Sequence, residues 1–166
     1  MQNKTRKAEA LVNVAIVLVA VAVCAVLARQ YLWAGAAERS RGPEVGTRVE
    51  LAGLNLAGEE RALLIVVSKD CRFCTESAPF YRRLAGEAAA RGGRVKLFAV
   101  VPHDAEEGRR YLGELGVAVE QVTRAHPAAL DVSGTPTLIM LERGAVSDVW
   151  VGALPPEREA EVLAKL

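Results

Sequence analysis

The stretch Ser68–Leu84, SKDCRFCTESAPFYRRL, decides the fold because it places two cysteines between two different hydrophobic patterns. Before the cysteines, Arg61–Ser68 (RALLIVVS) is an apolar run with several β-branched residues, which is typical of a strand buried on both faces. After them, Thr75–Arg91 carries apolar residues at spacings of four and is followed by two glycines, a pattern that predicts a helix. Cys71 and Cys74 therefore lie at a predicted strand-to-helix junction.

The same alternation of strand and helix patterns continues on both sides of this junction. Alternating or β-branched runs predict strands, and runs that begin with acidic residues or proline predict helices. The predicted order is β-βαβα-ββα, a mixed sheet with helices on both faces. The further elements are strands at 48–54, 94–102, 137–144 and 145–152 and helices at 104–116 and 155–166.

The N-terminal part of the chain has a different composition. Ala10–Ala28 contains nineteen residues without a charge, and a helix of that length spans roughly 28 Å, about one hydrocarbon core. Basic residues precede this segment, and Tyr31 and Trp33 follow it, as expected at a membrane interface. The pattern predicts a short cytoplasmic tail at 1–9, a single transmembrane anchor at 10–30, a linker at 31–44 and a soluble domain at 45–166.

Two kinds of cleaved signal are alternatives to the anchor. Ala34–Ala36 has the small residues of a signal-peptide cleavage site, but the apolar segment exceeds the usual ~7–15 residues. A lipoprotein signal at Cys24 fits poorly because Val23 is bulky. We therefore expect a retained anchor with the N-terminus in the cytoplasm and the soluble domain outside it, an orientation that the short N-terminal tail favours.

The charge of the chain is nearly balanced, with 21 basic and 20 acidic side chains. Proteins that bind nucleic acid or acidic surfaces through long-range attraction usually concentrate positive charge. The composition therefore predicts no nucleic-acid partner.

Cys71 is predicted to be the reactive cysteine of the pair. At the start of a helix, its sulfur lies near backbone N–H groups that have no partner within the helix and near the positive end of the helix dipole. Both features favour the thiolate, which is the nucleophilic form. Arg72 adds a nearby cation, whereas Asp70 acts in the opposite direction. Cys74, one turn further, is predicted to attack a mixed disulfide formed at Cys71 and release the substrate.

Three other uses of the cysteine pair are open. A structural disulfide across two residues closes a very small loop and contributes little entropic stabilisation. A zinc site would need Cys71, Cys74, His103 and His126, and these histidines match no common zinc-finger spacing. A Cu(I)-binding, metallochaperone-like module would use the two thiolates and one histidine. The redox interpretation is preferred, and it predicts no resident metal.

A second motif lies in Asp131–Leu141, DVSGTPTLIML, where Thr135 and Pro136 open a predicted strand. A proline is tolerated at the first residue of a strand, and a cis bond there would form a tight, fixed corner. Taken alone, the motif favours an ordinary trans proline that begins a strand, so a functional interpretation depends on the cysteine pair.

Together, the CxxC pair at a strand-to-helix junction, the GTPT sequence at 134–137, the hairpin and the last helix resemble the thioredoxin-like fold. The resemblance covers 45–166 and is strongest to membrane-anchored extracytoplasmic thiol–disulfide oxidoreductases. It implies an α/β domain with a mixed central β-sheet flanked by helices, beside one N-terminal transmembrane helix. It also implies that Pro79 kinks the active-site helix, that Pro136 is a cis-proline facing the cysteines, and that Thr135 presents its backbone to an extended substrate segment.

Three positions depart from that family. Asp70 replaces the tryptophan that precedes the first cysteine in thioredoxins, and Ile65 stands where they carry a buried acid. Ser77 occupies the position at which many anchored reductases have a glutamate, and Glu76 comes one place earlier. The sequence therefore assigns no proton acceptor to Cys74. The dipeptide between the cysteines matches no well-known oxidant or reductant, so the direction of electron flow is open.

The resemblance implies a membrane-tethered enzyme that reduces disulfides of extracytoplasmic or periplasmic proteins through the Cys71–Cys74 dithiol. The dithiol itself carries two electrons, so no organic cofactor is implied. The implied partners are cysteine-containing extracytoplasmic proteins, with apocytochromes among the candidates, and a membrane electron donor, because glutathione and thioredoxin are recycled in the cytosol. A potential of roughly −200 to −270 mV is expected. The competing function is Cu(I) delivery, although copper-delivery relatives separate their cysteines by three residues.

Overall fold

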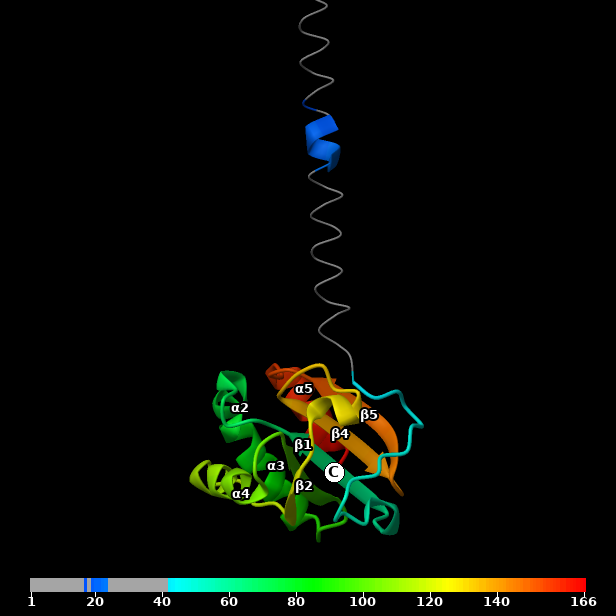
Figure 1. The fold of residues 1–166 in the computed structure, drawn as a ribbon, viewed down its shortest axis with the longest axis vertical. Coiled ribbons are helices and arrows are strands. Elements are labelled where there is room, and N and C mark those ends of the chain that lie inside the picture. The colour runs from blue at the N-terminus through cyan, green and yellow to red at the C-terminus, as the bar shows by residue number, and fades with distance from the viewer. Residues whose placement is uncertain (1–16, 18, 24–41) are drawn as a thin grey trace, which may run out of the picture. The chain divides into compact units, whose positions relative to one another are not determined.

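The computed structural model describes residues 17, 19–23 and 42–166 (Figure 1). Residues 17 and 19–23 are helical and belong to an N-terminal unit, and residues 42–166 belong to a second unit. The predicted tail at 1–9 and most of the predicted anchor at 10–30 and linker at 31–44 lie outside the described residues. Within the described ranges, no helix has both the length and the apolar character needed to cross a membrane.

Five strands of the second unit form one mixed sheet. They are β1 (Arg61–Val66), β2 (Lys96–Val101), β3 (Gln121–Arg124), β4 (Thr137–Glu142) and β5 (Ala145–Val151), arranged in the order β3-β2-β1-β4-β5. The apolar run before the cysteines is the central strand, β1, which pairs in parallel with β2 and antiparallel with β4. Residues 62–66 of this strand are all buried, as the continuous apolar pattern predicts. The cysteines therefore follow the most central strand of the sheet.

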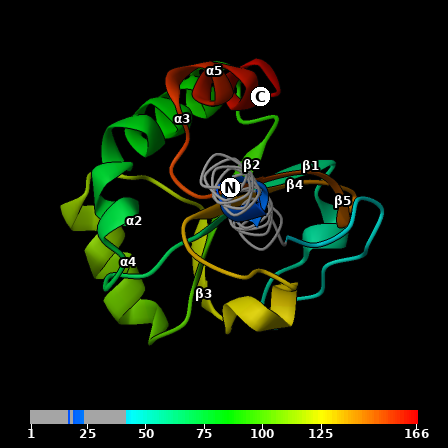
Figure 2. The same ribbon diagram turned by 90° about the horizontal axis from the view of Figure 1, so that it is seen from above.

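Within residues 42–166, six helical segments surround the sheet. They are the 3-10 helices η1 (Leu56–Gly58) and η2 (Pro127–Leu130) and the α-helices α2 (Arg72–Glu76), α3 (Ala78–Ala90), α4 (Ala105–Glu114) and α5 (Pro156–Ala164). The three longer helices, α3, α4 and α5, place Leu84, Leu112 and Val162 in one buried cluster with Ile65 of β1. Figure 2 shows α3 beside α5 on this face of the sheet.

The opposite face of the sheet carries a second buried cluster. Because side chains alternate along a strand, Leu64 points away from the face that Ile65 occupies. It packs with Leu56 of η1 and Leu130 of η2. The helices predicted on both faces are therefore three α-helices on one face and two short 3-10 helices on the other.

The strand predicted at 48–54 is wrong. Arg48 makes a single β-bridge with Ala145, and the chain then turns, with the Leu54 N–H donating to the Leu51 carbonyl oxygen at 3.1 Å. Gly53 in this turn has a φ of 81°, which glycine adopts readily because it has no Cβ. The apolar residues of this segment pack into the second cluster without a ladder of their own.

The sequence patterns did not predict β3, which lies at one edge of the sheet. Only its two central residues are buried, so it carries neither a long apolar run nor a clear alternation. Its outer edge is covered by the turn that replaces the predicted first strand. Gln121 donates from Nε2 to the Gly53 carbonyl oxygen at 3.0 Å, and Thr123 donates from Oγ1 to that of Ala52 at 3.2 Å.

The helix predicted at 75–91 begins earlier and is interrupted. α2 starts at Arg72, directly after Cys71, and ends at Glu76, and Ser77 is both its C-cap and the N-cap of α3. Pro79 lies in the first turn of α3. Because proline has no N–H, it cannot donate to the carbonyl of Thr75 as a continuous helix would require. The interruption gives the segment after Cys71 a single helical turn of its own.

Gly108 allows α4 to approach the sheet closely. A Cβ added there would lie 2.8 Å from Cγ2 of Val101 and 3.2 Å from Cγ1 of Val122, whereas one added at Gly86, exposed in α3, has no atom within 4 Å. We expect Gly86→Ala to raise the free energy of unfolding by about 0.5–1 kcal/mol through helix propensity. We expect Gly108→Ala to lower it by about 1 kcal/mol, because overpacking outweighs that gain.

Urea unfolding of both variants, followed by circular dichroism, measures this difference. A gain of stability in Gly108→Ala equal to that in Gly86→Ala would contradict the close packing of α4 on β2 and β3.

Candidate active site

Cys71 lies at the N-cap of α2, where β1 ends and the helix begins. Its backbone is extended, with φ −99° and ψ 107°, and its Sγ accepts the backbone N–H of Cys74 at 3.2 Å. Its carbonyl oxygen accepts the N–H groups of Cys74 and Thr75 in the first helical turn. The sulfur therefore shares the Cys74 N–H with the Cys71 carbonyl oxygen at the start of the helix, close to the backbone N–H groups as the sequence predicted. Cys71 is partly exposed and can be reached by another molecule.

Cys74 lies behind Cys71 and is fully buried, in the cluster formed by α3, α4, α5 and the sheet. Burial, together with its hydrogen-bond coupling to Cys71, raises the pKa of the Cys74 thiol to about 12. Both cysteines are reduced in this structure. The two sulfurs thus differ in access and in proton affinity, and only Cys71 suits a first attack on an external disulfide.

The segment before β4 approaches the dithiol from a distant part of the sequence. The Cys71 thiol donates to the carbonyl oxygen of Thr135 at 3.3 Å, and the Thr135–Pro136 peptide bond is cis. The Gly152 N–H donates to the Pro136 carbonyl oxygen at 2.7 Å, and the Thr137 hydroxyl donates to a carbonyl of the same loop. The structure therefore brings together all four residues predicted for the site, whereas their roles toward a substrate stay predictions.

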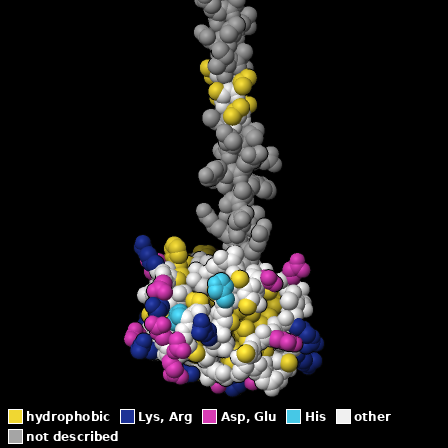
Figure 3. All heavy atoms as spheres, viewed as in Figure 1, with side chains coloured by type: hydrophobic (Ala, Val, Ile, Leu, Met, Phe, Trp, Pro, Cys, Tyr) yellow, Lys and Arg dark blue, Asp and Glu magenta, His cyan; other side chains and the backbone are white. Residues whose placement is uncertain are grey.

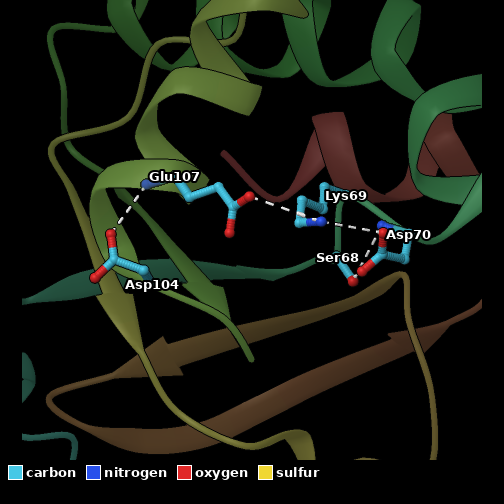
Figure 4. A network of polar contacts seen from close by, with 5 residues as sticks. All are labelled: Ser68, Lys69, Asp70, Asp104 and Glu107. Carbon is cyan, nitrogen blue, oxygen red and sulfur yellow. Dashed lines mark hydrogen bonds and ion pairs between the residues drawn. The ribbon is translucent and has the colours of Figure 1, made fainter.

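Charged side chains surround the loop that precedes Cys71 (Figure 4). Lys69 lies between two carboxylates, with its Nζ 3.3 Å from Oδ1 of Asp70 and 3.7 Å from Oε1 of Glu107 on α4. The hydrogen bond to Asp70, and then the charges of Asp70 and Glu107, raise the pKa of Lys69. Asp104, the N-cap of α4, accepts the backbone N–H of Glu107 at 3.2 Å and so fixes the start of that helix.

On the other side of Cys71, Arg72 pairs with Glu76 at 2.7 Å, so the cation expected to favour the thiolate is balanced by a carboxylate. Two cations and three carboxylates thus lie in the ion pairs around the dithiol, a net charge of −1. The side-chain charges near Cys71 are thus nearly balanced, and the hydrogen bond that its sulfur accepts comes from the Cys74 backbone N–H. The face drawn in Figure 3 likewise intersperses acidic and basic side chains.

Replacing Lys69 by glutamine should slow the attack of Cys71 on a small disulfide reagent. The carboxylates of Asp70 and Glu107 would then have no cation beside them, and their charge would disfavour the thiolate. We expect the second-order rate constant to fall about two- to fivefold at low salt and the effect to shrink in 0.5 M NaCl, because exposed charges are screened. Stopped-flow absorbance with an aromatic disulfide measures the rate.

Lys69→Arg should restore the rate, because it keeps the positive charge. Lys96→Gln is the matched control. Lys96 also pairs with a carboxylate, that of Glu120 at 3.3 Å, but it lies at the start of β2, whereas Cys71 follows the end of the parallel strand β1. Equal effects of Lys69→Gln and Lys96→Gln would show that Lys69 has no specific influence on Cys71.

Two tyrosines of the helices lie near the dithiol, and the sequence patterns did not single them out. Tyr81 of α3 is buried in the cluster that contains Cys74, and burial raises the pKa of its phenol. The hydroxyl of Tyr111 on α4 lies 3.0 Å from Oγ1 of Thr75, and burial raises its pKa as well. Both phenols are protonated at neutral pH and can donate hydrogen bonds, but they are not bases.

α4 contacts the segment that contains the two cysteines (the dithiol segment, residues 69–75) both before and after Cys71. Glu107 meets Lys69 before Cys71, and Tyr111, one turn along α4, meets Thr75 after it. In the sequence, the only sign of this contact was that Glu107 and Tyr111 lie four residues apart and so share one face of a predicted helix. This spacing does not indicate which segment that face contacts.

The carboxylates considered as proton acceptors for Cys74 are engaged with other side chains. Asp70 pairs with Lys69, Glu76 pairs with Arg72, and both are largely exposed, whereas Cys74 is fully buried. Ile65, at the position of the buried acid in thioredoxins, packs in the apolar cluster around Cys74. No proton acceptor for Cys74 is therefore identified among the ion-paired carboxylates of the site.

The histidines of the open zinc alternative lie in loops. Both ring nitrogens of His103 are buried without a hydrogen-bond partner, and Nδ1 of His126 accepts the Ala128 N–H at the start of η2. Within residues 17, 19–23 and 42–166, no group of three or more His, Cys, Asp or Glu residues is placed to hold a metal ion. The four residues of that alternative are thus not assembled into a common site.

Comparison with solved structures gives the fold. The chain is similar to a thiol–disulfide isomerase from Corynebacterium glutamicum (TM-score 0.54, 17% identity, covering 75% of this chain and 92% of that one). It is also similar to a secreted disulfide oxidoreductase from Mycobacterium tuberculosis (0.53, 16%, 74% and 96%) and to a thiol:disulfide interchange protein of the thioredoxin family from Chlorobium tepidum (0.53, 15%, 75% and 95%). The domain has the thioredoxin-like fold.

No family model and no curated protein matches the sequence of this thioredoxin-like domain. At identities of 15–17%, the similarity establishes the fold and leaves the activity to be argued from the site. In the thioredoxin-like domain, that site is the dithiol at the start of α2, with the cis-proline loop against it.

Proposed function

We propose that the protein is a thiol–disulfide oxidoreductase that reduces disulfides of other proteins through Cys71 and Cys74. Cys71, as thiolate, attacks one sulfur of the substrate disulfide, and the other substrate sulfur leaves as a thiol. Cys74 then attacks Cys71 in the mixed disulfide, which releases the second substrate thiol and leaves a Cys71–Cys74 disulfide. Two electrons pass to the substrate, so no organic cofactor takes part.

The observation that carries this proposal is the unequal placement of the two sulfurs. Cys71 is partly exposed and accepts the Cys74 N–H at the helix start, whereas Cys74 is fully buried directly behind it. A structural disulfide gains nothing from an exposed sulfur that accepts an N–H, and a metal site would need further ligands that are not gathered within the described residues. An attacking and a resolving thiol need this asymmetry.

The reducing direction is supported by the small number of groups that contact the Cys71 sulfur. Strong oxidants of this type are oxidising because their reduced form is stabilised. Here the sulfur accepts one N–H, faces the Thr135 carbonyl oxygen at 3.3 Å and lies among ion pairs with a net charge of −1. The potential should therefore lie near roughly −200 to −270 mV, the range of glutaredoxins and thioredoxin.

We further propose that residues 10–30 anchor the enzyme in a membrane with the domain outside the cytoplasm. The uncharged nineteen-residue segment and its flanking basic and aromatic residues support this arrangement. Cysteine-containing extracytoplasmic proteins would be the substrates, and a membrane protein would supply electrons, since cytosolic recycling systems do not reach that compartment.

The test is a redox titration of the full-length chain, solubilised in detergent, against glutathione and dithiothreitol, with thiol alkylation and mass spectrometry as the readout. A single two-electron transition between roughly −200 and −270 mV supports the proposal. A potential near about −120 mV would reverse the direction of electron flow. Absence of an intramolecular Cys71–Cys74 disulfide would overturn the redox function and favour Cu(I) binding.

The step performed by Cys74 should depend strongly on pH. Burial, the main cause of its raised pKa of about 12, persists in the mixed disulfide. At neutral pH Cys74 is therefore almost entirely in its thiol form. The resolving rate should therefore rise about tenfold per pH unit between pH 7 and pH 9. Rapid quenching of a preformed Cys71–peptide mixed disulfide measures this rate, and a flat profile would indicate a proton acceptor that the structure does not identify.

A further inference from the structure

Phe73, between the two cysteines, has an unusual position for a large apolar side chain. It is 58% exposed, whereas its neighbour Cys74 is fully buried. Successive residues of a helix differ by about 100° in direction, so the burial of Cys74 turns Phe73 outward. The Phe73 carbonyl oxygen accepts the Ser77 N–H, which holds the residue in the single turn of α2.

This exposure is rare in the domain. Among residues 42–166, Val45 and Phe73 are the large hydrophobic side chains that are exposed. Figures 1 and 2 show α2 at the periphery of this unit. An aromatic ring in water contributes nothing to the core, whereas burying it against another molecule is favourable.

The charges beside Phe73 do not oppose an apolar partner. Arg72 and Glu76 are exposed but satisfy each other at 2.7 Å, so a substrate residue can approach the ring without separating a charge from its only counter-ion. Cys71, two residues earlier on the same turn, must form a covalent bond with the substrate sulfur. Any substrate segment bonded to Cys71 is thus held against α2.

We propose that Phe73 is a specificity-determining residue that contacts an apolar side chain adjacent to the target cysteine of a substrate protein. The occupant of this surface is the cysteine-bearing segment itself, because the bond to Cys71 brings that segment to it. The inference rests on the proposed function and adds a sequence preference: substrates carry an aliphatic or aromatic residue next to the cysteine that Cys71 attacks.

Two five-residue peptides test this preference with the reduced full-length chain. Each has a central cysteine joined to thionitrobenzoate through a disulfide, with leucine on both sides of the cysteine in one peptide and glycine in the other. Cys71 attacks the peptide sulfur, and thionitrobenzoate, the better leaving group, departs and is detected by absorbance. Cys74 then attacks Cys71 and releases the peptide thiol. In total, the Cys71–Cys74 dithiol loses two electrons, and the disulfide between the peptide and thionitrobenzoate gains them.

The measured quantity is the ratio of the second-order rate constants for the leucine and glycine peptides. Using a ratio cancels any general change in the reactivity of Cys71. We expect a ratio of about ten for the wild-type chain, the size of effect typical of an apolar contact, and a ratio below about two for Phe73→Ala. Phe73→Leu should keep most of the preference. Arg72→Ala, at the exposed neighbouring position, is the matched control and should keep it entirely.

The outcomes separate this inference from the function on which it rests. Release of thionitrobenzoate from both peptides at equal rates by the wild-type chain would overturn the role of Phe73 and leave the oxidoreductase intact. The same holds if Phe73→Ala keeps the wild-type ratio. Failure to oxidise Cys71 and Cys74 to a disulfide with either peptide would overturn the proposed function as well.

Discussion

The Cys74→Ser variant is expected to lose turnover on the order of a thousandfold while it keeps the first chemical step. Cys71 remains at the start of α2, where it accepts the backbone N–H of residue 74, a contact that does not involve the Cys74 side chain. The variant should therefore attack a disulfide but fail to resolve the adduct. Mass spectrometry should find a stable mixed disulfide at Cys71, and the trapped partners would identify the substrates.

Cys71→Ser is the matched control for this experiment. It removes the exposed sulfur and leaves the buried one, whose pKa of about 12 makes it a poor nucleophile at neutral pH. It should show neither turnover nor an adduct. Efficient trapping by Cys71→Ser and none by Cys74→Ser would reverse the assigned roles of the two cysteines.

The Ile65→Asp variant is expected to lower the free energy of unfolding by about 3–5 kcal/mol at pH 8, because it buries a charge without a partner. Ile65 is fully buried near the C-terminal end of the central strand, between Ala99 and Leu138 on the neighbouring strands. Burial raises the pKa of such a carboxyl above its unfolded value of about 3.9. The loss should therefore be smaller at pH 5, where the folded protein holds the acid protonated, and should grow as the pH rises to 8.

Ile65→Asn is the control, because its side chain is polar and of the same shape but does not ionise. Its stability loss, measured by urea unfolding relative to the wild-type chain, should be the same at pH 5 and pH 8. Equal losses for the two variants at pH 8 would show that residue 65 can be hydrated or paired. In that case the thioredoxin-type acid would be compatible with this core.

The elements with strong local patterns could be predicted from the sequence. The central strand, the strands at 96–101 and 137–151 and the helices at 105–114 and 156–164 agree with the patterns to within a few residues. The Arg143–Gly144 hairpin also agrees, and both of its residues have the positive φ that a tight turn needs. In these segments, the period of the apolar residues and the turn chemistry point to the same structure.

The errors lie where tertiary contacts decide the local structure. The segment at 48–54 alternates like a strand, yet Gly53 turns it across the edge of β3. β3 itself is short and half exposed, and its pairing with β2 is a contact between distant segments. Neither the turn at 48–54 nor the strand β3 has a local sequence signal, because each forms only when the segment that it contacts is in place.

In the candidate site, too, contacts between residues close in sequence could be predicted, whereas contacts between distant segments could not. Cys71 and Cys74 are close in sequence, so their spacing and the helix start predicted their arrangement. The approach of Thr135 followed only from the resemblance to a known fold. The contacts of Glu107 and Tyr111 with the dithiol segment depend on the docking of α4 against the sheet, which Gly108 permits and no local pattern predicts.

The burial of Cys74 also bears on how the two cysteines are expected to respond to hydrogen peroxide. Because Cys71 is partly exposed and Cys74 is fully buried, we expect peroxide to oxidise Cys71 first, to a sulfenic acid. The second sulfur stays available to condense with the sulfenic acid, which expels water and forms the disulfide. Formation of this disulfide, which thiols can reduce again, is expected to compete with further oxidation of Cys71 to the irreversible sulfinic acid.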